Sequence, residues 1–197
     1  MKRAIDVLLG GLALICAAPV AFAVAVAVRL VDGSPVLFRH RRSGRGGRPF
    51  TMLKFRTMRA ADPDELGPAH DAARVTRLGR FLRSTSLDEL PSLLNVVRGD
   101  MSLVGPRPLP VSYLRRYDDR QARRLEVRPG ITGWAVVNGR NTPSWQDRLE
   151  LDVWYVERRS LRLDLQILAR TVRLVARRTG VEHRAGVTMT EFRGPGS

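Results

Sequence analysis

The sequence predicts a mostly helical α+β protein that is attached to a membrane by its N-terminal segment. Three observations lead to this prediction. The segment from Val7 to Val28 contains no charged side chain, amphipathic helical patterns fill most of the following chain, and strand-like runs occur only near residues 36–38 and 50–58. With 197 residues, the chain is long enough for an anchor at residues 1–32 and one compact domain at residues 33–197.

The uncharged segment has the length of a helix that crosses or deeply enters a bilayer with a hydrocarbon core of about 30 Å. Pro19 near its middle removes a backbone hydrogen bond and bends a helix, which suits a segment that enters and leaves by the same face. Basic residues on both flanks favour cytoplasmic positions for both ends. A straight spanning helix and a signal peptide cleaved near Ala21-Phe22-Ala23 remain alternatives. We interpret Asp6 as an interfacial residue without a catalytic role.

The charge balance indicates an anionic partner, because 34 Lys and Arg residues face 19 Asp and Glu residues. Nucleic acid, anionic lipid and phosphate-bearing substrates all satisfy this condition. The single cysteine, Cys16, excludes an intrachain disulfide and a Cys-based zinc site. The histidines, His40, His70 and His183, lack the spacing of a zinc site or a catalytic triad, and we interpret them as surface residues.

The domain after the anchor begins with the two predicted strands, which an Arg/Gly-rich loop at 43–48 separates and a loop at 60–69 follows. Helices are then predicted at residues 71–83, 86–97, 111–127, 144–159 and 161–178. The last of these is basic and amphipathic, suited to anionic lipid or to packing against the domain. Asn138-Gly139 predicts a tight hairpin turn, and no periodicity is evident after Val181.

One of these helices begins with the adjacent acids Asp88 and Glu89. Ser86 and Glu89 match a capping box, and Asp88 is an alternative cap that better accommodates Pro91. Adjacent acids at a helix start usually do no more than cap it, but the amides and the dipole of the same turn also bind phosphate. Carboxylates also hold Mg²⁺, which bridges protein acids to substrate phosphates, so the pair favours phosphoryl chemistry.

Several basic residues are candidates for binding phosphate. Arg83, Arg107 and Arg128 each lie beside a structural break, and the prolines around Arg107 hold it on a stiff, extended backbone. Arginine is suited to bidentate phosphate contacts. Lys54 is the only lysine beyond the N-terminus, and it lies with Arg56 on the strand expected at 50–58.

Four ordered blocks carry a family resemblance. They are Lys54-Phe55-Arg56-Thr57-Met58, Ser86-Leu87-Asp88-Glu89-Leu90-Pro91, Gly99-Asp100-Met101-Ser102-Leu103-Val104-Gly105-Pro106-Arg107-Pro108 and Arg128-Pro129-Gly130-Ile131-Thr132-Gly133-Trp134. These blocks closely resemble the bacterial monotopic phosphoglycosyl transferases, or bacterial sugar transferases. The resemblance covers nearly the whole chain, whose length is similar to that of the minimal members without additional transmembrane helices.

The resemblance implies transfer of a sugar 1-phosphate from a UDP-sugar to undecaprenyl phosphate, with release of UMP, as the first membrane step of glycan assembly. It also implies a monotopic protein at the cytoplasmic face of the inner membrane, with a re-entrant helix bent at Pro19 and a cytoplasmic catalytic domain at 33–197. Ala18 stands where the family often has a serine. The implied partners are the UDP-sugar, undecaprenyl phosphate and anionic phospholipid, without nucleic acid; a homodimer is left open.

Carried over by motif, Asp88 resembles the nucleophile that attacks the β-phosphate and forms an aspartyl phosphosugar in a ping-pong reaction. Glu89 is implied to position or deprotonate the polyprenyl phosphate, and both acids to contact Mg²⁺. Lys54, Arg83 and Arg107 look like phosphate-binding residues, and the Arg128 block like a substrate-site element. By analogy with small members, the tail at 186–192 favours an N-acetylated amino sugar.

Two functions of other classes compete with this interpretation. A membrane-tethered basic protein that binds nucleic acid would explain the charge, but the chain carries no recognisable nucleic-acid-binding motif. Attraction of the basic flanks to anionic lipid explains the same charge. An inactive scaffold of a glycan pathway is the other alternative, and the intact acidic and Pro-Arg-Pro motifs argue against it.

Overall fold

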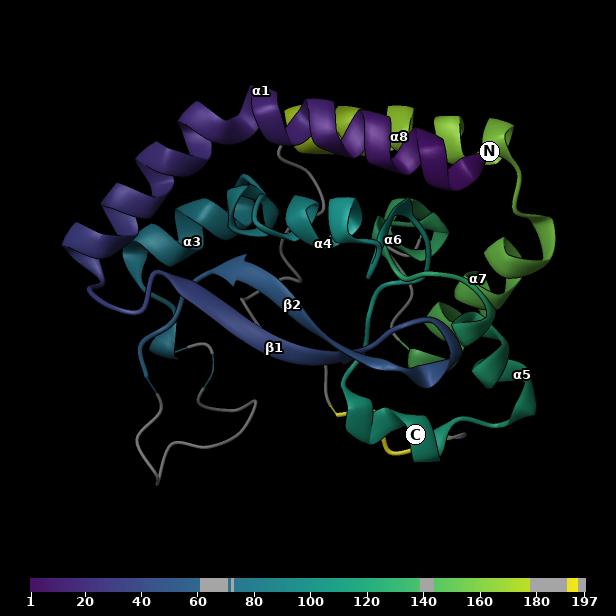
Figure 1. Ribbon diagram of the computed structural model, residues 1–197. Helices are drawn as coiled ribbons and strands as arrows, with labels where there is room; N and C mark the ends of the chain where they lie inside the picture. Colours follow the sequence, from purple (N-terminus) through teal and green to yellow (C-terminus); the bar gives the residue numbers. More distant parts are fainter. Residues whose placement is uncertain (61–70, 72, 139–143, 178–190, 195–197) are drawn as a thin grey trace.

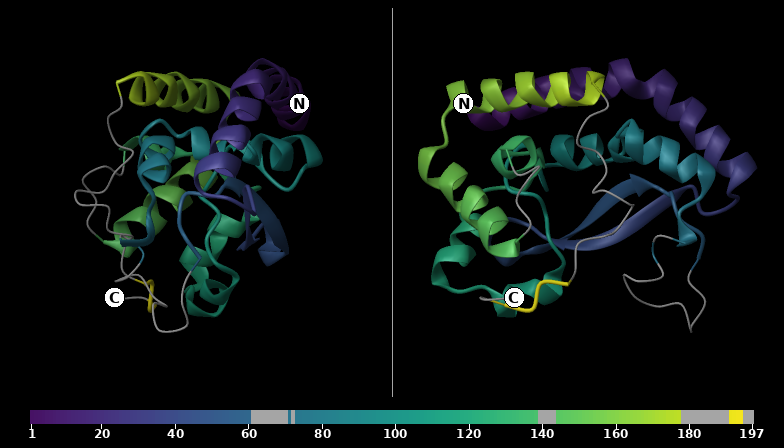
Figure 2. Two further views of the ribbon diagram at one scale, coloured as in Figure 1. Left: turned by 90° about the vertical axis from the view of Figure 1, so that its left-hand side faces the viewer. Right: turned by 180° about the vertical axis from the view of Figure 1, so that it is seen from behind.

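The computed structural model describes residues 1–60, 71, 73–138, 144–177 and 191–194. Helices α1 (Lys2–Val31) and α8 (Leu161–Ala176) lie side by side on one face of the molecule (Figures 1 and 2). Short helices and a β-hairpin form the body beneath them. The predicted mostly helical fold with small β elements is therefore confirmed.

Helix α1 is long and apolar enough to cross a membrane, with a mean hydropathy of 2.5 over an 18-residue window that is only 11% buried. Pro19 lies inside the helix, which changes direction about halfway along its length (Figure 1). Large apolar side chains remain exposed along α1, among them Leu8, Leu12, Ile15, Phe22 and Leu30. Helix α8 adds exposed Leu165 and Val172 to the same layer. This apolar surface indicates that the protein associates with a membrane.

Both halves of α1 contact the body. In the first half, Gly10 approaches α4 (Ser92–Arg98) so closely that a Cβ atom there would lie 3.0 Å from Val96 Cγ1. In the second half, Val24 and Val28 are buried in a cluster that also contains Phe55 and Leu82. The two ends of the helix are therefore held by the same domain.

Asp6 corrects the interpretation of an interfacial residue, because its side chain is buried, with 4% of the residue exposed. Its carboxylate accepts hydrogen bonds from Ser102 Oγ at 3.0 Å and from the Leu103 amide at 3.1 Å. Both donors lie on strand β3 (Ser102–Val104). Asp6 thus fixes the N-terminal half of α1 to the body.

Replacing Asp6 with Ala should lower the free energy of unfolding by about 2 kcal/mol, because a buried hydroxyl and a buried amide lose their acceptor. Thermal unfolding of detergent-solubilised protein measures this change. Asp119→Ala is the matched control, since Asp119 is exposed and should change the melting temperature little. Equal melting temperatures for the two variants would show that Asp6 does not fix α1.

Strands β1 (Leu37–Ser43) and β2 (Pro49–Phe55) form an antiparallel hairpin around the 3-10 turn η1 (Arg45–Gly47). β1 extends well beyond the run predicted at 36–38, because its arginine-rich half pairs with β2 as regularly as its apolar half. Phe38 pairs with Lys54, and His40 pairs with Met52. Side chains alternate between faces along a strand, so these four residues share one face of the hairpin. A second, parallel sheet joins β3 to β4 (Gly130–Thr132).

The helices predicted at 71–83 and 86–97 are both interrupted. In the first, residues 71, 73 and 74 are helical, Val75 forms a β-bridge with Met58, and α3 (Arg77–Ser84) begins after its cap, Thr76. The second is split into a 3-10 turn, η3 (Leu87–Glu89), and α4, which follows Pro91. The predicted capping box is wrong: Ser86 adopts a left-handed conformation, with φ of 58°, and its side chain makes no capping bond. Gly99 ends α4 as predicted, with φ of 100°.

The single helix predicted at 111–127 is also wrong. The segment consists of three short pieces, which are η4 (Val111–Arg116), α5 (Asp119–Ala122) and η5 (Arg123–Glu126). Tyr117 has an extended backbone, and Asp118 with Gln121 forms a capping box that begins a new helix. The apolar spacing alone does not reveal this break.

The C-terminal helices follow the prediction more closely. Ser144 caps α7 (Trp145–Arg158) by accepting a hydrogen bond from the Asp147 amide, and α8 begins one residue after Ser160. The predicted hairpin turn is wrong at Asn138, which belongs to α6 (Trp134–Asn138), and Gly139 lies outside the described residues. The loop at 61–69, His70, His183 and most of the tail at 186–192 also lie outside them.

Candidate active site

The two adjacent acids lie on the 3-10 turn η3, between α3 and α4. Ser86 begins the turn with a left-handed backbone conformation. Its carbonyl accepts a hydrogen bond from the Glu89 amide at 3.2 Å. Ser92 Oγ donates to the Glu89 carbonyl at 2.6 Å and so ties the turn to α4. The Asp88 and Glu89 side chains are 11% and 17% exposed. The turn therefore holds two largely desolvated carboxylates.

Two basic residues from other elements meet these acids. Lys54 Nζ, from β2, lies 2.5 Å from Glu89 Oε1 and 3.7 Å from Asp88 Oδ2. An Arg107 guanidinium nitrogen, from the proline-rich loop after β3, lies 2.8 Å from the same Glu89 oxygen. Three predicted blocks of the sequence are thus brought together in one cluster.

The surroundings of the two acids shift their pKa values in opposite directions. Burial alone would raise the pKa of Glu89, but Arg107 and Lys54 together hold it well below its ordinary value. Burial raises the pKa of Asp88 above its ordinary value, although Lys54 lies nearby. Glu89 is thus a fixed anion that neutralises two cations. Asp88 is the more basic carboxylate and the better nucleophile of the two.

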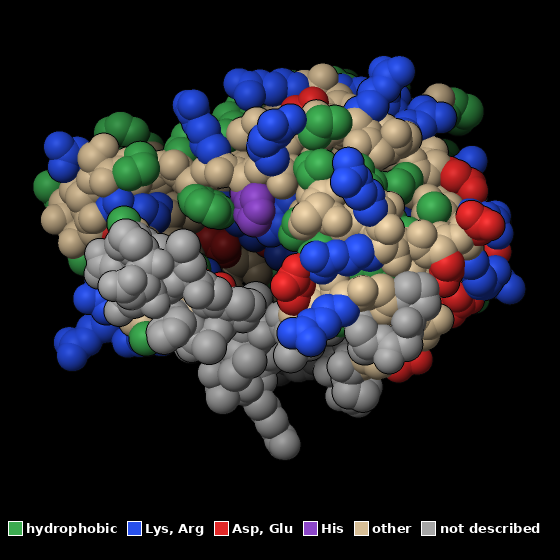
Figure 3. Space-filling model, turned by 90° about the horizontal axis from the view of Figure 1, so that it is seen from below, with side chains coloured by type: hydrophobic (Ala, Val, Ile, Leu, Met, Phe, Trp, Pro, Cys, Tyr) green, Lys and Arg blue, Asp and Glu red, His purple; other side chains and the backbone are tan. Residues whose placement is uncertain are grey.

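The surface of the molecule opposite α1 and α8 has a hollow (Figure 3). Seen from the side opposite α1 and α8, acidic and basic atoms lie deep inside this hollow, with further basic side chains around it (Figure 3). The opening therefore faces away from the apolar layer. A small polar molecule can enter the hollow from solvent without crossing that layer.

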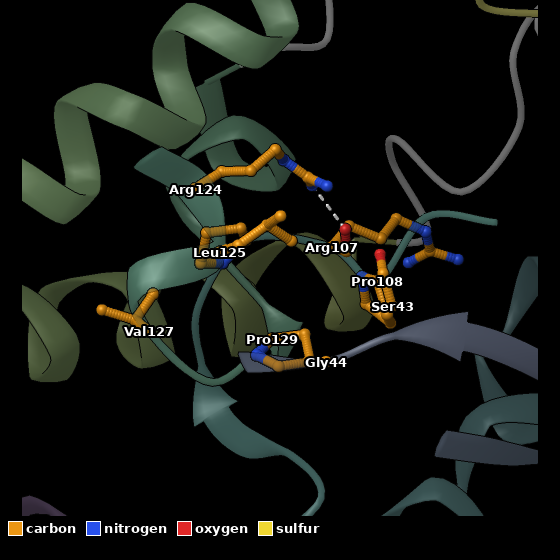
Figure 4. Close-up of a pocket in the computed structure, with 9 residues that line it drawn as sticks. Ser43, Gly44, Arg107, Pro108, Arg124, Leu125, Val127 and Pro129 are labelled. Atoms are coloured by element: carbon orange, nitrogen blue, oxygen red, sulfur yellow. Dashed lines mark hydrogen bonds between the residues drawn. The ribbon is translucent and has the colours of Figure 1, made fainter. Parts of the chain in front are cut away.

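The loop that carries Arg107 is held by a buried arginine, Arg124. A guanidinium nitrogen of Arg124 donates to the Arg107 carbonyl at 2.6 Å (Figure 4). Arg124 also pairs with Asp152 at 2.7 Å and donates to Tyr117 Oη at 3.0 Å. The small pocket in Figure 4 adjoins this loop and is lined by Ser43, Gly44, Pro106, Arg107, Pro108, Arg124, Leu125, Val127 and Pro129.

Sequence reasoning did not identify Arg124 and Asp152 as part of this support. The two residues are 28 positions apart, and in the sequence each resembles the solvated charges of a basic amphipathic chain. A signal exists only at Asp152, which falls between the apolar residues Leu151 and Val153 on a helix. Their side chains are 2% and 5% exposed, so the pair is an internal feature of the fold.

Comparison with known proteins identifies the family of this chain. The family model described as "Bacterial sugar transferase" matches residues 1–178. The chain belongs to the bacterial sugar transferase family. Residues 1–178 include α1, the acid cluster and the Arg124 support, so all three lie in the part of the chain that the family model matches.

Individual sugar transferases are similar over most of this chain. An uncharacterized sugar transferase of Bacillus subtilis, EpsL, is 48% identical over all of this chain and 97% of its own length. A UDP-glucose:undecaprenyl-phosphate glucose-1-phosphate transferase of Caulobacter vibrioides is 43% identical, over 87% of this chain and 68% of its own. The undecaprenyl-phosphate galactose phosphotransferase of Salmonella typhimurium is 39% identical, over 91% of this chain and 41% of its own.

The other predicted basic residues of this sugar transferase take different positions. Arg83 Nε donates to Thr57 Oγ1 at 3.0 Å, and the charge of Arg83 acts on Asp88, so this arginine belongs to the cluster. Arg128 Nε instead donates to the Gly99 carbonyl at 2.9 Å, at the end of α4. The structure therefore joins Arg83 to the acids and gives Arg128 a role in holding the chain.

The contacts of Arg56 also differ from those expected of a phosphate-binding residue. Its guanidinium donates to the carbonyls of Asp32 and Ser34, just after the end of α1. These contacts hold the connection between α1 and the body. Among the residues that the structure describes, Arg56 makes no hydrogen bond or ion pair with the acid cluster, although it is only two residues from Lys54.

The donor set at the acid pair fits a magnesium ion that is shared with a substrate. Within the described part of the chain, no third histidine, cysteine or carboxylate joins Asp88 and Glu89 in a metal-binding group. Mg²⁺ commonly takes one or two protein carboxylates and completes its shell with water and substrate phosphates. Two hard oxygen donors beside Lys54 and Arg107 match that pattern.

Replacing Glu89 with Gln should destabilise the protein at neutral pH by about 2 kcal/mol, because Lys54 and Arg107 lose their shared anion. Glu89 has a lowered pKa in the folded state, so its contribution is present above the ordinary carboxyl pKa of about 4.3 and is lost as the pH falls further. Urea unfolding at several pH values measures this. The two proteins should converge in acid; a pH-independent difference would contradict the ion-pair origin.

Proposed function

We propose that this protein transfers a sugar 1-phosphate from a UDP-sugar to undecaprenyl phosphate, releasing UMP and forming undecaprenyl-diphosphate-sugar. The observation that carries the proposal is the acid pair: Lys54 and Arg107 contact Glu89, Lys54 also lies near Asp88, and the pKa values of the two acids shift in opposite directions. The names of the relatives from Caulobacter and Salmonella support the same class of reaction. The hollow that opens away from the apolar layer suits a water-soluble nucleotide sugar (Figure 3).

The first half-reaction uses Asp88 as the nucleophile. A carboxylate oxygen of Asp88 attacks the β-phosphorus of the UDP-sugar, and the bond from this phosphorus to the bridging oxygen breaks. The electron pair stays on the oxygen, which leaves with UMP, and an aspartyl phosphosugar remains on the enzyme. Lys54 and Arg107 lie where they can neutralise the phosphate oxygens during this step.

In the second half-reaction, a phosphate oxygen of undecaprenyl phosphate attacks the phosphosugar and releases the Asp88 carboxylate. A phosphate monoester has a second pKa near 6, so the acceptor is largely ionised at neutral pH and needs no strong base. The lowered pKa of Glu89 also makes it a weak base. Of the two roles implied for Glu89, positioning and deprotonation, we therefore assign positioning: Glu89 holds Lys54 and Arg107 in place for both half-reactions.

Asp88 and Glu89 are the residues that would hold Mg²⁺. When bound, the ion neutralises the charge of the pyrophosphate and polarises the phosphorus that is attacked. Asp88 is the better placed of the two, because Glu89 already pairs with Lys54 and Arg107 through one oxygen.

We further propose that α1 enters the cytoplasmic membrane and returns to the cytoplasmic face. Both halves of α1 contact the same domain, and Pro19 lies inside the helix, which bends. A straight spanning helix would carry one end away from the domain. The exposed apolar residues of α1 and α8 form one layer for contact with lipid, and the basic residues flanking α1 suit anionic headgroups.

Purified protein in detergent tests the proposed reaction. With Mg²⁺, undecaprenyl phosphate and a panel of UDP-sugars, it should release UMP. UDP-glucose and UDP-galactose come first, because relatives are named for glucose and galactose transfer; N-acetylated UDP-sugars follow. No UMP release from folded protein across the panel would overturn the proposal, and salt-dependent DNA binding that is indifferent to UDP-sugar would favour the nucleic-acid alternative.

A further inference from the structure

A further cationic residue, Arg42, lies close enough to Arg107 for the two positive charges to repel each other. Phe38, His40 and Arg42 alternate along β1 and therefore share the hairpin face that carries Lys54. Arg42 forms a β-bridge with Pro110, and the next residue, Ser43, donates its amide to the Leu109 carbonyl at 2.9 Å. The end of β1 is thus attached to the loop that carries Arg107.

The guanidinium of Arg42 has no counter-ion in the described part of the structure. Its Nε atom is buried and has no hydrogen-bond partner there. Burial, followed by the repulsion of Arg107, lowers the pKa of Arg42 to about 10, and the hydroxyls of Tyr113 and Tyr117 oppose this shift. The Glu89 carboxylate already serves Lys54 and Arg107. A half-buried cation beside another cation is costly unless an anion binds there.

His40 lies between this cation and Lys54 and carries no charge at neutral pH. Burial, together with Arg42 and Lys54, lowers the pKa of His40 to about 4. Its neutral ring offers a hydrogen-bond donor and an acceptor without adding repulsion. The ring also contacts Phe38 edge to face, with 5.5 Å between centroids. This face therefore offers a cation, a neutral polar ring and an aromatic side chain.

We propose that Arg42 binds the α-phosphate of the donor nucleotide, the phosphate that leaves in UMP, with His40 as its uncharged neighbour. The inference rests on the proposed function. Asp88 attacks the β-phosphate beside Lys54 and Arg107, and Arg42 is the cation next to Arg107 that lacks a counter-ion, so it is available to the adjoining α-phosphate. When the bond to the bridging oxygen breaks, the new negative charge lies on the phosphate at Arg42, which stabilises the leaving group.

Calorimetric titration with UMP and with uridine tests this binding without any turnover. Wild-type protein should bind UMP more tightly than uridine. Arg42→Ala should lower the affinity for UMP roughly 10- to 100-fold and leave that for uridine unchanged, because only the charged contact is lost. Arg42→Lys should retain part of the preference for UMP and serves where Arg42→Ala does not fold. Arg41→Ala is the matched control, since Arg41 is exposed on the other face of β1.

Two results would overturn the inference: UMP affinity in folded Arg42→Ala equal to that in Arg41→Ala, or equal losses for UMP and uridine. Half-reaction kinetics provide a second measurement. Arg42→Ala should slow formation of the phosphosugar adduct and leave transfer from the adduct to undecaprenyl phosphate unchanged. Arg42-dependent UMP binding without turnover of any UDP-sugar would reject the proposed function alone, whereas normal turnover with Arg42-independent UMP binding would reject this inference alone.

Discussion

Asp88→Asn should abolish UMP release and the covalent phosphosugar adduct. The amide is nearly isosteric with the carboxylate but is not a nucleophile, so the loss should reach at least about 10⁴-fold in kcat, as for other nucleophiles that act in covalent catalysis. Intact-mass measurement after exposure to each UDP-sugar tests for the adduct, and a UMP assay tests turnover. An adduct on Asp88→Asn would place the nucleophile elsewhere.

The same substitution should raise the melting temperature at neutral pH. Burial raises the pKa of Asp88 in the folded state, so above its ordinary pKa the unfolded state holds fewer protons and stability falls as the pH rises. Asparagine carries no charge and avoids this penalty. Asp119→Asn, at an exposed position, should show neither the loss of activity nor the gain in stability. A destabilised Asp88→Asn variant would mean that Lys54 and Arg107 need this charge.

Local signals in the sequence predicted elements correctly where one residue decides the backbone. Gly99 ends α4 because a left-handed conformation suits glycine, and Ser144 caps α7 through its hydroxyl. The same reasoning failed at Ser86, because this serine adopts the left-handed conformation and its side chain makes no capping hydrogen bond. Pro91 was the better signal, since a proline fits a helix start and α4 begins immediately after it.

The acids and the basic residues were candidates on their own, but their meeting in one cluster was predictable only through the family resemblance. Spacing along the chain does not show that Lys54 and Arg107 reach the same oxygen of Glu89, because the meeting depends on how β2 and the proline-rich loop pack against η3. Arg56 shows that proximity in the sequence does not predict membership of the site. It is close to Lys54 in the chain, but its guanidinium points to the carbonyls after α1. Arg42 and Asp6 were missed because their burial depends on tertiary contacts.

Arg124→Met should destabilise the protein by roughly 3–5 kcal/mol, because it leaves the Asp152 carboxylate buried without its partner. Burial raises the pKa of Asp152 even with Arg124 present, which shows how dependent this carboxylate is on the pair. Chemical unfolding with urea measures the loss. Arg123→Met is the matched control, because Arg123 is the adjacent residue and its ion pairs with Glu126 and Glu157 are exposed. It should change stability little.

The double variant Arg124→Met with Asp152→Leu separates stability from positioning. Replacing both members of a buried ion pair with apolar residues is often nearly neutral, so most of the lost stability should return. The hydrogen bond from Arg124 to the Arg107 carbonyl stays absent, so Arg107 loses its support and the KM for UDP-sugar should remain raised. Recovery of both stability and KM would show that Arg124 serves folding alone; recovery of stability without KM identifies Arg124 as a positioning residue for Arg107.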